Sequence, residues 1–275
     1  MDWMSQYKLP VGEWMEAVVD FMTDHGGGFF DWIAVSLETV IQGLIELLMM
    51  LHPLAFILLV ASGAGWLQRR WSISIFVVLG LGLIWNLGYW QETIETLALV
   101  LFATGFCVLL GVPVGIAAAH RPWLYRGLRP LLDLMQTIPT FVYLIPTLTL
   151  FGLGVVPGLI STIIFAIAAP IRLTHLGITQ VPEELLEAGK AFGCKPTALL
   201  FKVEIPAAMS SILAGVTQCI MLSLSMVVIA ALVGADGLGK PVVRALNTVD
   251  IATGFEAGLA IVLIAILLDR MFKKA

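Results

Sequence analysis

The residues most often used for catalysis or metal binding are few and scattered in this sequence. They are the histidines and cysteines His25, His52, His120, His175, Cys107, Cys194 and Cys219. An intramembrane protease or a zinc site needs clustered groups such as H-E-x-x-H or C-x-x-C, and neither pattern occurs. The phosphate-binding pattern G-x-x-x-x-G-K-[ST] is also absent. We therefore expect no catalytic residue, no metal site and no nucleotide hydrolysis on this chain, and cysteines that pack as free thiols.

The longest polar interval between apolar segments, residues 177–206, has the composition of two short helices. Its acidic residues precede its basic ones, in the order Glu183, Glu184, Glu187, Lys190, Lys195 and Lys202. This order complements a helix dipole, so we predict a helix over 182–192 that begins at a proline. Gly193 ends this helix, and Pro196 begins a second one through Val203. An ordered helix pair is suited to docking a partner, and the alternative is a merely solvated loop.

A second set of polar residues interrupts apolar segments. They are Gln136, Thr137, Tyr143, Gln218, Ser223 and Ser225. Polar side chains are costly inside a membrane and usually face a cavity or a neighbouring helix. These residues are therefore candidates for lining a translocation path, and hydrogen bonding between helices explains each of them equally well. The nearby Asp133 is expected to pair with Arg129, one turn earlier.

The segments that carry these residues have the apolar composition of membrane proteins. Hydrophobic residues make up 59% of the 275-residue chain and charged residues 12%, and the mean hydropathy is +0.98. Seven segments are mostly apolar over the roughly 20 residues that a membrane-crossing helix needs. They lie near 48–67, 72–90, 93–118, 131–153, 157–177, 207–233 and 255–269. We predict an all-α fold, a polytopic membrane helix bundle of about seven transmembrane helices.

The distribution of Lys and Arg predicts the orientation, because positive side chains are retained on the cytoplasmic side. If the N-terminus is outside, 12 of the 15 basic residues fall on the inner side. They are Arg69, Arg70, Arg121, Arg126, Arg129, Arg172, Lys190, Lys195, Lys202, Arg270, Lys273 and Lys274. Only Lys8, Lys240 and Arg244 remain outside. The chain is therefore expected to be N-out and C-in, with residues 177–206 in the cytoplasm.

The residues before the first apolar segment predict a helix with one wet face. Over Phe29–Met50, apolar residues recur at helical spacing opposite polar ones. We expect an interfacial amphipathic helix along the outer membrane surface, or alternatively the outer end of the first span. The glycines at 26–28 suggest a flexible joint before it. Residues 1–24 are polar and acidic, so no cleavable signal peptide is expected.

One pattern of fixed spacing lies within the polar interval. Glu187, Ala188 and Gly189 are followed after three residues by Gly193, and after nine more by Val203, Glu204, Ile205 and Pro206. The pattern resembles the EAA loop of ABC-importer permeases, which reads E-A-A, three residues, G, nine residues, I-x-L-P. The departures, Gly189, Val203 and Ile205, are small or volume-conserving. Residues 129–154, 170–189, 221–239 and 255–270 further resemble the permeases of glycine betaine, proline betaine and choline importers.

The resemblance implies a type I ABC importer permease fold and a domain organisation. Its permease core would be 93–270 with the cytoplasmic coupling loop 177–206. Two peripheral transmembrane helices would occupy 51–92. An extracytoplasmic tail and the interfacial helix would occupy 1–50, and a cytoplasmic tail 271–275. The chain would be a multi-pass permease of a bacterial inner membrane that takes part in ATP-driven import of choline or glycine betaine.

The resemblance also implies partners and site residues. The partners are a second copy of the chain, two ATP-binding subunits, an extracytoplasmic solute-binding protein and membrane lipid, with no nucleic acid. No cofactor is expected in this chain, since ATP and Mg would be on the ATPase. The residues expected to couple to the ATPase are Glu184, Glu187, Ala188, Gly189, Gly193, Val203, Ile205 and Pro206. Phe141 and Tyr143 join the path candidates because aromatic faces suit a quaternary amine.

Two other function classes are compatible with an apolar helical chain. An ion-coupled secondary transporter of small organic solutes, or a channel, could have the same spans and internal polar groups. Neither needs a cytoplasmic helix pair to dock an ATPase, so this pair favours the importer. An intramembrane enzyme is disfavoured because the histidines are isolated from one another.

Overall fold

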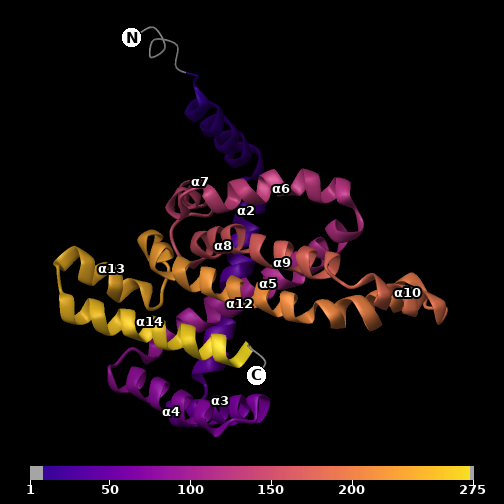
Figure 1. The fold of residues 1–275 in the computed structure, drawn as a ribbon. Helices are drawn as coiled ribbons and strands as arrows, with labels where there is room; N and C mark the ends of the chain where they lie inside the picture. The colour runs from indigo at the N-terminus through magenta and orange to yellow at the C-terminus, as the bar shows by residue number, and fades with distance from the viewer. Residues whose placement is uncertain (1–8, 273–275) are drawn as a thin grey trace, which may run out of the picture.

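The computed structural model describes residues 9–272, which are mainly helical and contain no strand (Figure 1). The helices are α2 (Val11–Met49), α3 (Pro53–Gln68), α4 (Trp71–Asn86), α5 (Trp90–His120), α6 (Pro122–Thr137), η1 (Thr140–Tyr143), α7 (Leu144–Phe151), α8 (Val155–Ala166), α9 (Ala168–Thr179), α10 (Glu183–Ala191), α11 (Pro196–Leu199), η2 (Leu200–Glu204), α12 (Ile205–Ala230), η3 (Ala231–Val233), α13 (Gly239–Thr248) and α14 (Ile251–Phe272). Lys8, Lys273 and Lys274 lie outside the described residues, as does most of the tail expected over 271–275. The all-α membrane helix bundle is confirmed.

Five of the described helices are long and apolar enough to cross a membrane, or up to six if one bent pair counts as a span. The sequence predicted about seven, and two of its predicted spans correspond to the shorter apolar helices α3 and α4. α3 and α4 have 16 residues each, fewer than the roughly 20 that a crossing needs, and pack together as a short hairpin. The segment expected near 131–153 is bent by 105° between α6 and η1–α7. The bend falls before Pro139, because a proline disfavours helical geometry in the residue that precedes it.

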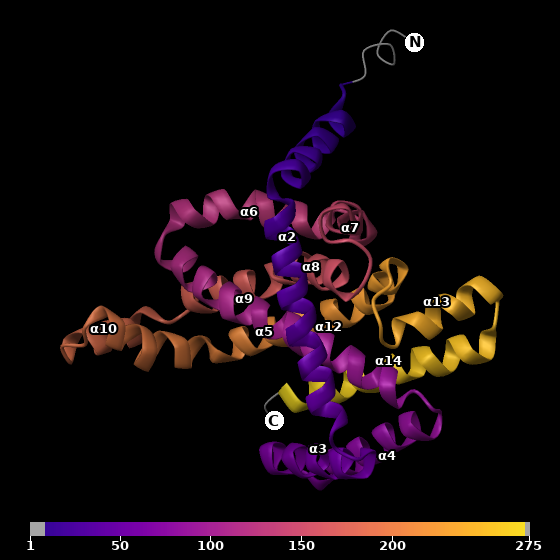
Figure 2. The ribbon, with the colours of Figure 1, turned by 180° about the vertical axis from the view of Figure 1, so that it is seen from behind.

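The N-terminal helix α2 differs from the expectation at its glycines. It is continuous over 39 residues, so the flexible joint predicted at 26–28 is wrong. Glycine lowers helix propensity by about 1 kcal/mol, but it does not end a helix whose backbone stays right-handed. Figures 1 and 2 show α2 crossing the outside of the bundle, with its N-terminal part projecting beyond it. Its length and composition also fit a span, so the surface position of 29–50 stays a prediction.

α5, α8, α9 and α12 pack against one another at the centre of the bundle. Buried residues such as Ile94, Leu99, Leu159 and Ile220 fill the space between them. Lipid tails are as apolar as these side chains, so association depends on close packing of small residues. A Cβ at Gly115 of α5 would lie only 2.7 Å from the carbonyl oxygen of Ile171 on α9. The absence of a side chain there sets how closely the two helices approach.

Gly115→Val should therefore force α5 and α9 apart. Overpacking of this kind costs about 1–3 kcal/mol. The matched control is Gly105→Val on the same helix, where a Cβ meets no heavy atom within 4 Å. Thermal unfolding of the purified variants in one detergent should give a lower midpoint for Gly115→Val. Equal midpoints for the two variants would contradict the close crossing.

The bundle has two distinct ends, marked by α10 and α13. α10 and α13 lie at opposite extremities in both views, with α12 running between them (Figures 1 and 2). α5 also runs from one end to the other. Its first turn lies near α13, where Glu92 and Lys240 line one pocket. Its last residue, His120, contacts Glu204 at the α10 end.

Candidate functional site

The helix-pair segment, residues 182–206, folds as α10 followed by a tight turn, α11 and η2. The predicted helix after Pro182 is confirmed, and it ends where Gly193 takes a φ of +74°. The amide of Gly193 donates to the Lys190 carbonyl at 2.9 Å, and that of Cys194 donates to the Gly189 carbonyl at 3.1 Å. These bonds satisfy carbonyls that the helix end would otherwise leave unpaired. The second predicted helix does not stop at Val203, since 196–233 runs on as one long element.

Gly189 allows the two parts of this segment to pack closely. It is buried, and a Cβ there would lie 2.5 Å from Cδ1 of Leu199. The family pattern has alanine at this place, so the glycine is a departure that lets α10 approach α11. The result is a compact pair of helices joined by a turn, as expected for a rigid docking element.

The helix-pair segment is anchored on one side and exposed on the other. Leu186 and Ile205 pack against a buried cluster that includes Ile178 on α9 and Ile212 on α12, with Ile116 on α5 beside it. Three apolar residues of the segment are exposed: Leu185, Phe192 and Phe201. Phe192 is 89% exposed. Exposed aromatic groups rimmed by charges are typical of a surface that binds another protein.

A buried carboxylate lies where the segment joins α12. Glu204 is only 7% exposed and ends η2, a π-helical turn. Its Oε2 lies 2.9 Å from Nε2 of His120, the last residue of α5, but accepts no well-aligned hydrogen bond from a described residue. The other ring nitrogen of His120 lies 2.9 Å from the Ile116 carbonyl. Burying a carboxylate is costly unless a polar or charged group lies against it, and the His120 side chain is the group that does so here.

The predicted coupling residues are gathered in this one segment. Glu184, Glu187, Ala188, Gly193 and Pro206 are exposed. Gly189 is buried, whereas Val203 and Ile205 are half-buried. The sequence pattern did not single out Glu204 or His120 as partners. Their contact depends on the end of α5 packing beside η2.

The predicted path residues fall into two groups. Gln136, Thr137, Phe141 and Tyr143 lie around the bend between α6 and α7, and η1 at this bend contacts α12. The Tyr143 hydroxyl donates to the Met135 carbonyl at 2.8 Å across the bend. Gln218, Ser223 and Ser225 lie on α12. Gln218 and Ser225 are exposed seven residues apart on one face, whereas Ser223 is buried, so the structure does not gather all three.

Asp133 pairs with a different arginine from the expected one. Its Oδ1 accepts a hydrogen bond from Arg172 of α9 at 2.7 Å, so the predicted pair with Arg129 is wrong. The reason is that α6 lies across α9. The ring of Tyr125 on α6 also stacks on His175 of α9, with centroids 3.5 Å apart. Tertiary packing, rather than spacing within one helix, sets the partner.

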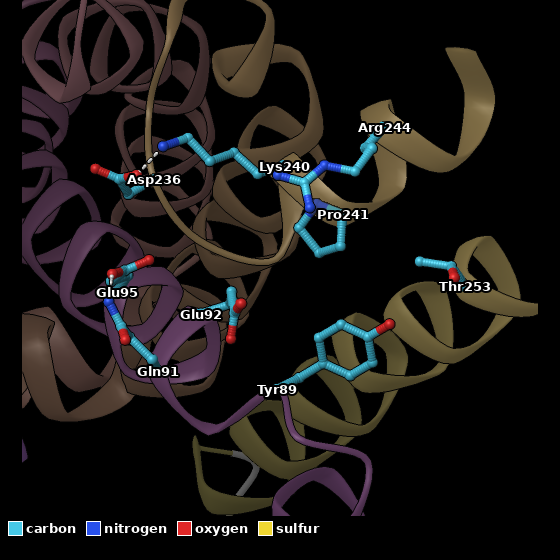
Figure 3. Close-up of a pocket in the computed structure, with 9 residues that line it drawn as sticks. All are labelled: Tyr89, Gln91, Glu92, Glu95, Asp236, Lys240, Pro241, Arg244 and Thr253. Atoms are coloured by element: carbon cyan, nitrogen blue, oxygen red, sulfur yellow. Dashed lines mark hydrogen bonds and ion pairs between the residues drawn. The ribbon is translucent and has the colours of Figure 1, made fainter. Parts of the chain in front are cut away.

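Sequence reasoning missed a polar pocket of about 350 Å³ at the α13 end, shown in Figure 3. Its charged and aromatic lining residues are Tyr89, Glu92, Glu95, Asp236, Lys240 and Arg244. Asp236 and Lys240 form an ion pair, and the Gln91 amide donates to Glu95 at 3.0 Å. Among the described residues, Glu92 and Arg244 have no ion-pair partner. The feature of the sequence that could have indicated this pocket is the pair of basic residues, Lys240 and Arg244, which the predicted orientation places outside the membrane.

The pKa of Tyr89 depends on burial and on nearby carboxylates. Burial raises the pKa of Tyr89 above its ordinary value, and the carboxylates of Glu256 and Glu92 raise it further. The region around the ring is therefore negative, while Arg244 extends over the opposite side of the pocket (Figure 3). The pocket has a negative side and a positive side.

Comparison with known proteins gives consistent similarities. A family described as "Binding-protein-dependent transport system inner membrane component" matches residues 111–273. The chain is 45% identical to the glycine betaine transport system permease protein OpuAB of Bacillus subtilis, over 96% of this chain and 93% of that one. It is 42% identical to the glycine betaine/proline betaine transport system permease protein ProW of Escherichia coli, over 96% and 74%. A chain of the MetNI methionine ABC transporter shares the fold, with a TM-score of 0.57 and 23% identity over 63% of this chain and 88% of that one.

Proposed function

Because the chain belongs to the family of binding-protein-dependent transport system inner membrane components, we propose that it is the permease of an ATP-driven importer of quaternary ammonium compounds. Glycine betaine is the substrate best supported, since OpuAB and ProW are described as glycine betaine permeases. Choline is a second candidate: a choline transport permease of Bacillus subtilis is 33% identical over 53% of this chain. The bundle then provides the path through the inner membrane.

The observation that carries the coupling mechanism is the helix-pair segment. It has exposed apolar side chains, and Leu186 and Ile205 pack it against α5, α9 and α12. An ATPase that grips Phe192 and Phe201 and then closes would move this anchor, and with it the spans. Coupling requires two states with different contacts, and a stiff helix pair transmits the difference.

The partners follow from the same proposal. Two copies of the chain enclose the path, each bound to one ATP-binding subunit that holds ATP and Mg, and an extracytoplasmic solute-binding protein delivers the solute. Hydrolysis takes place on the partner, because this sequence has no phosphate-binding loop. The chain lies N-out and C-in, which puts the helix-pair segment on the side of the ATPase. The exposed path candidates, which include Phe141, Gln218 and Ser225, then face the second copy.

Uptake by the reconstituted complex tests the proposal against an ion-coupled carrier. Liposomes that hold the permease, its ATPase and its solute-binding protein should accumulate radiolabelled glycine betaine only when ATP is supplied to the ATPase. Collapse of the proton and sodium gradients with ionophores should leave that uptake unchanged. Uptake that survives ATP depletion and stops with the ionophores would support the carrier instead.

A further inference from the structure

The polar pocket at the α13 end has the size of a small-molecule site. Its volume of about 350 Å³ lies within the roughly 300–1,000 Å³ of such sites. Its walls come from the start of α5, the loop after η3, α13 and the start of α14. Segments far apart in the sequence thus enclose one space, as Figure 3 shows.

One side of the pocket suits a cation that cannot donate hydrogen bonds. The ring of Tyr89 and the carboxylate of Glu92 border the same space (Figure 3). An aromatic face attracts a diffuse cation, and desolvation strengthens the attraction. Glu92 has no hydrogen bond or ion pair to another described residue, so its charge is available to a ligand. Glu95 adds a second carboxylate, which Gln91 already contacts.

The opposite side suits a carboxylate. Lys240 is neutralised by Asp236, which leaves Arg244 as the cation without a described acidic partner. A guanidinium binds a carboxylate through two parallel hydrogen bonds, a geometry that an ammonium does not offer. Opposite charges on neighbouring elements usually pair directly. Here the cavity lies between Glu92 and Arg244. A ligand whose cation lies against Glu92 and whose anion lies against Arg244 therefore pairs with both.

We propose that this pocket binds one small zwitterion, with its quaternary ammonium against Tyr89 and Glu92 and its carboxylate on Arg244. The pocket then receives solute on the permease itself, before the solute enters the path between the spans. A single side chain of a docking protein brings one charge, whereas a betaine brings both at a short separation. This inference rests on the proposed function, because it takes the solute from there.

Two solutes that differ in one charge test the assignment. Glycine betaine carries an ammonium and a carboxylate, and choline has a hydroxyl in place of the carboxylate. Binding of each radiolabelled solute is measured by equilibrium dialysis on the permease–ATPase complex in nanodiscs, without the solute-binding protein. Arg244→Gln should weaken glycine betaine binding about tenfold or more and change choline binding less than about twofold. Glu92→Gln should weaken both solutes, and Arg126→Gln, an exposed base on α6, should weaken neither.

Three results would overturn the proposal. The first is no saturable binding of glycine betaine to the wild-type complex below about 1 mM. The second is an equal loss of both solutes in Arg244→Gln. The third is unchanged solute binding in Arg244→Gln with loss of co-sedimentation of the solute-binding protein, which would make the pocket a protein dock. ATP-dependent import of glycine betaine by the wild-type complex is measured in parallel. If import is absent, the proposed function is refuted. If import is present and one of the three results is found, only the proposal about the pocket is refuted.

Discussion

Gly193→Val is expected to abolish ATP-driven uptake while the chain stays in the membrane. The residue has a φ of +74° and a Cβ there would meet no heavy atom within 4 Å, so the effect comes from the backbone and not from a clash. A left-handed conformation costs roughly 1–2 kcal/mol for a residue with a side chain, and more for a β-branched one. Each 1.4 kcal/mol is a factor of ten in population. The population of the packed arrangement of α10 and α11 should therefore fall about tenfold or more relative to other arrangements of the turn.

Three measurements separate this effect from misfolding. Uptake of radiolabelled glycine betaine into membrane vesicles gives the activity, immunoblotting gives the amount of permease, and co-purification gives the bound ATPase. Gly193→Asn is the conservative variant, because asparagine tolerates the left-handed region, and it should retain much of the uptake. Gly43→Val, at an open position of α2, should behave as wild type. Normal uptake by Gly193→Val would remove the rigid turn from the coupling mechanism.

His120→Leu is expected to destabilise the protein because it leaves the buried Glu204 carboxylate without the imidazole that lies 2.9 Å from it. Removing one member of a buried pair costs about 3–5 kcal/mol. The His120 side chain is 47% exposed, so water screens part of the interaction and we expect about 2 kcal/mol. The double variant His120→Leu/Glu204→Leu should recover most of that loss, since no isolated charge remains.

A double-mutant cycle measures the coupling of the two side chains. The midpoints of thermal unfolding for the wild type, both single variants and the double variant give the interaction free energy. A strongly non-additive cycle is expected, with the two single variants less stable than the double variant. Additive losses would mean that His120 and Glu204 do not stabilise each other. Uptake by the double variant then tests whether the link between α5 and η2 serves transport as well as stability.

The features predicted well from the sequence are those that depend on local chemistry. Pro182, the acidic first turn and Gly193 act within a few residues, and α10 and its left-handed end follow from them. Apolar runs of sufficient length likewise give α5, α12 and α14. The pattern around Glu187 was identified by its resemblance to the EAA loop, and its residues fall in one segment of the structure.

The features predicted poorly depend on packing between distant segments. Asp133 has a basic residue one turn away, yet it contacts Arg172 because α6 crosses α9. The bend at Pro139 divides a run that hydropathy alone joins. The glycines at 26–28 suggest a break, but the flanking residues continue the helix through them. The polar pocket could not be predicted because its lining residues come from both halves of the chain.

The two long helices that join the ends of the bundle have a mechanical consequence. α5 spans 31 residues, or ~46 Å, and hydrogen bonds along its axis resist compression. A displacement imposed at His120 therefore travels as a shift or tilt of a stiff rod, with little elastic loss along the way. The weak point is Pro113, where the missing amide hydrogen bond lets the rod bend. Pro113 lies seven positions before His120, and Gly115, just beyond it, packs closely on α9, so α9 supports the rod where its own hydrogen bonding is interrupted.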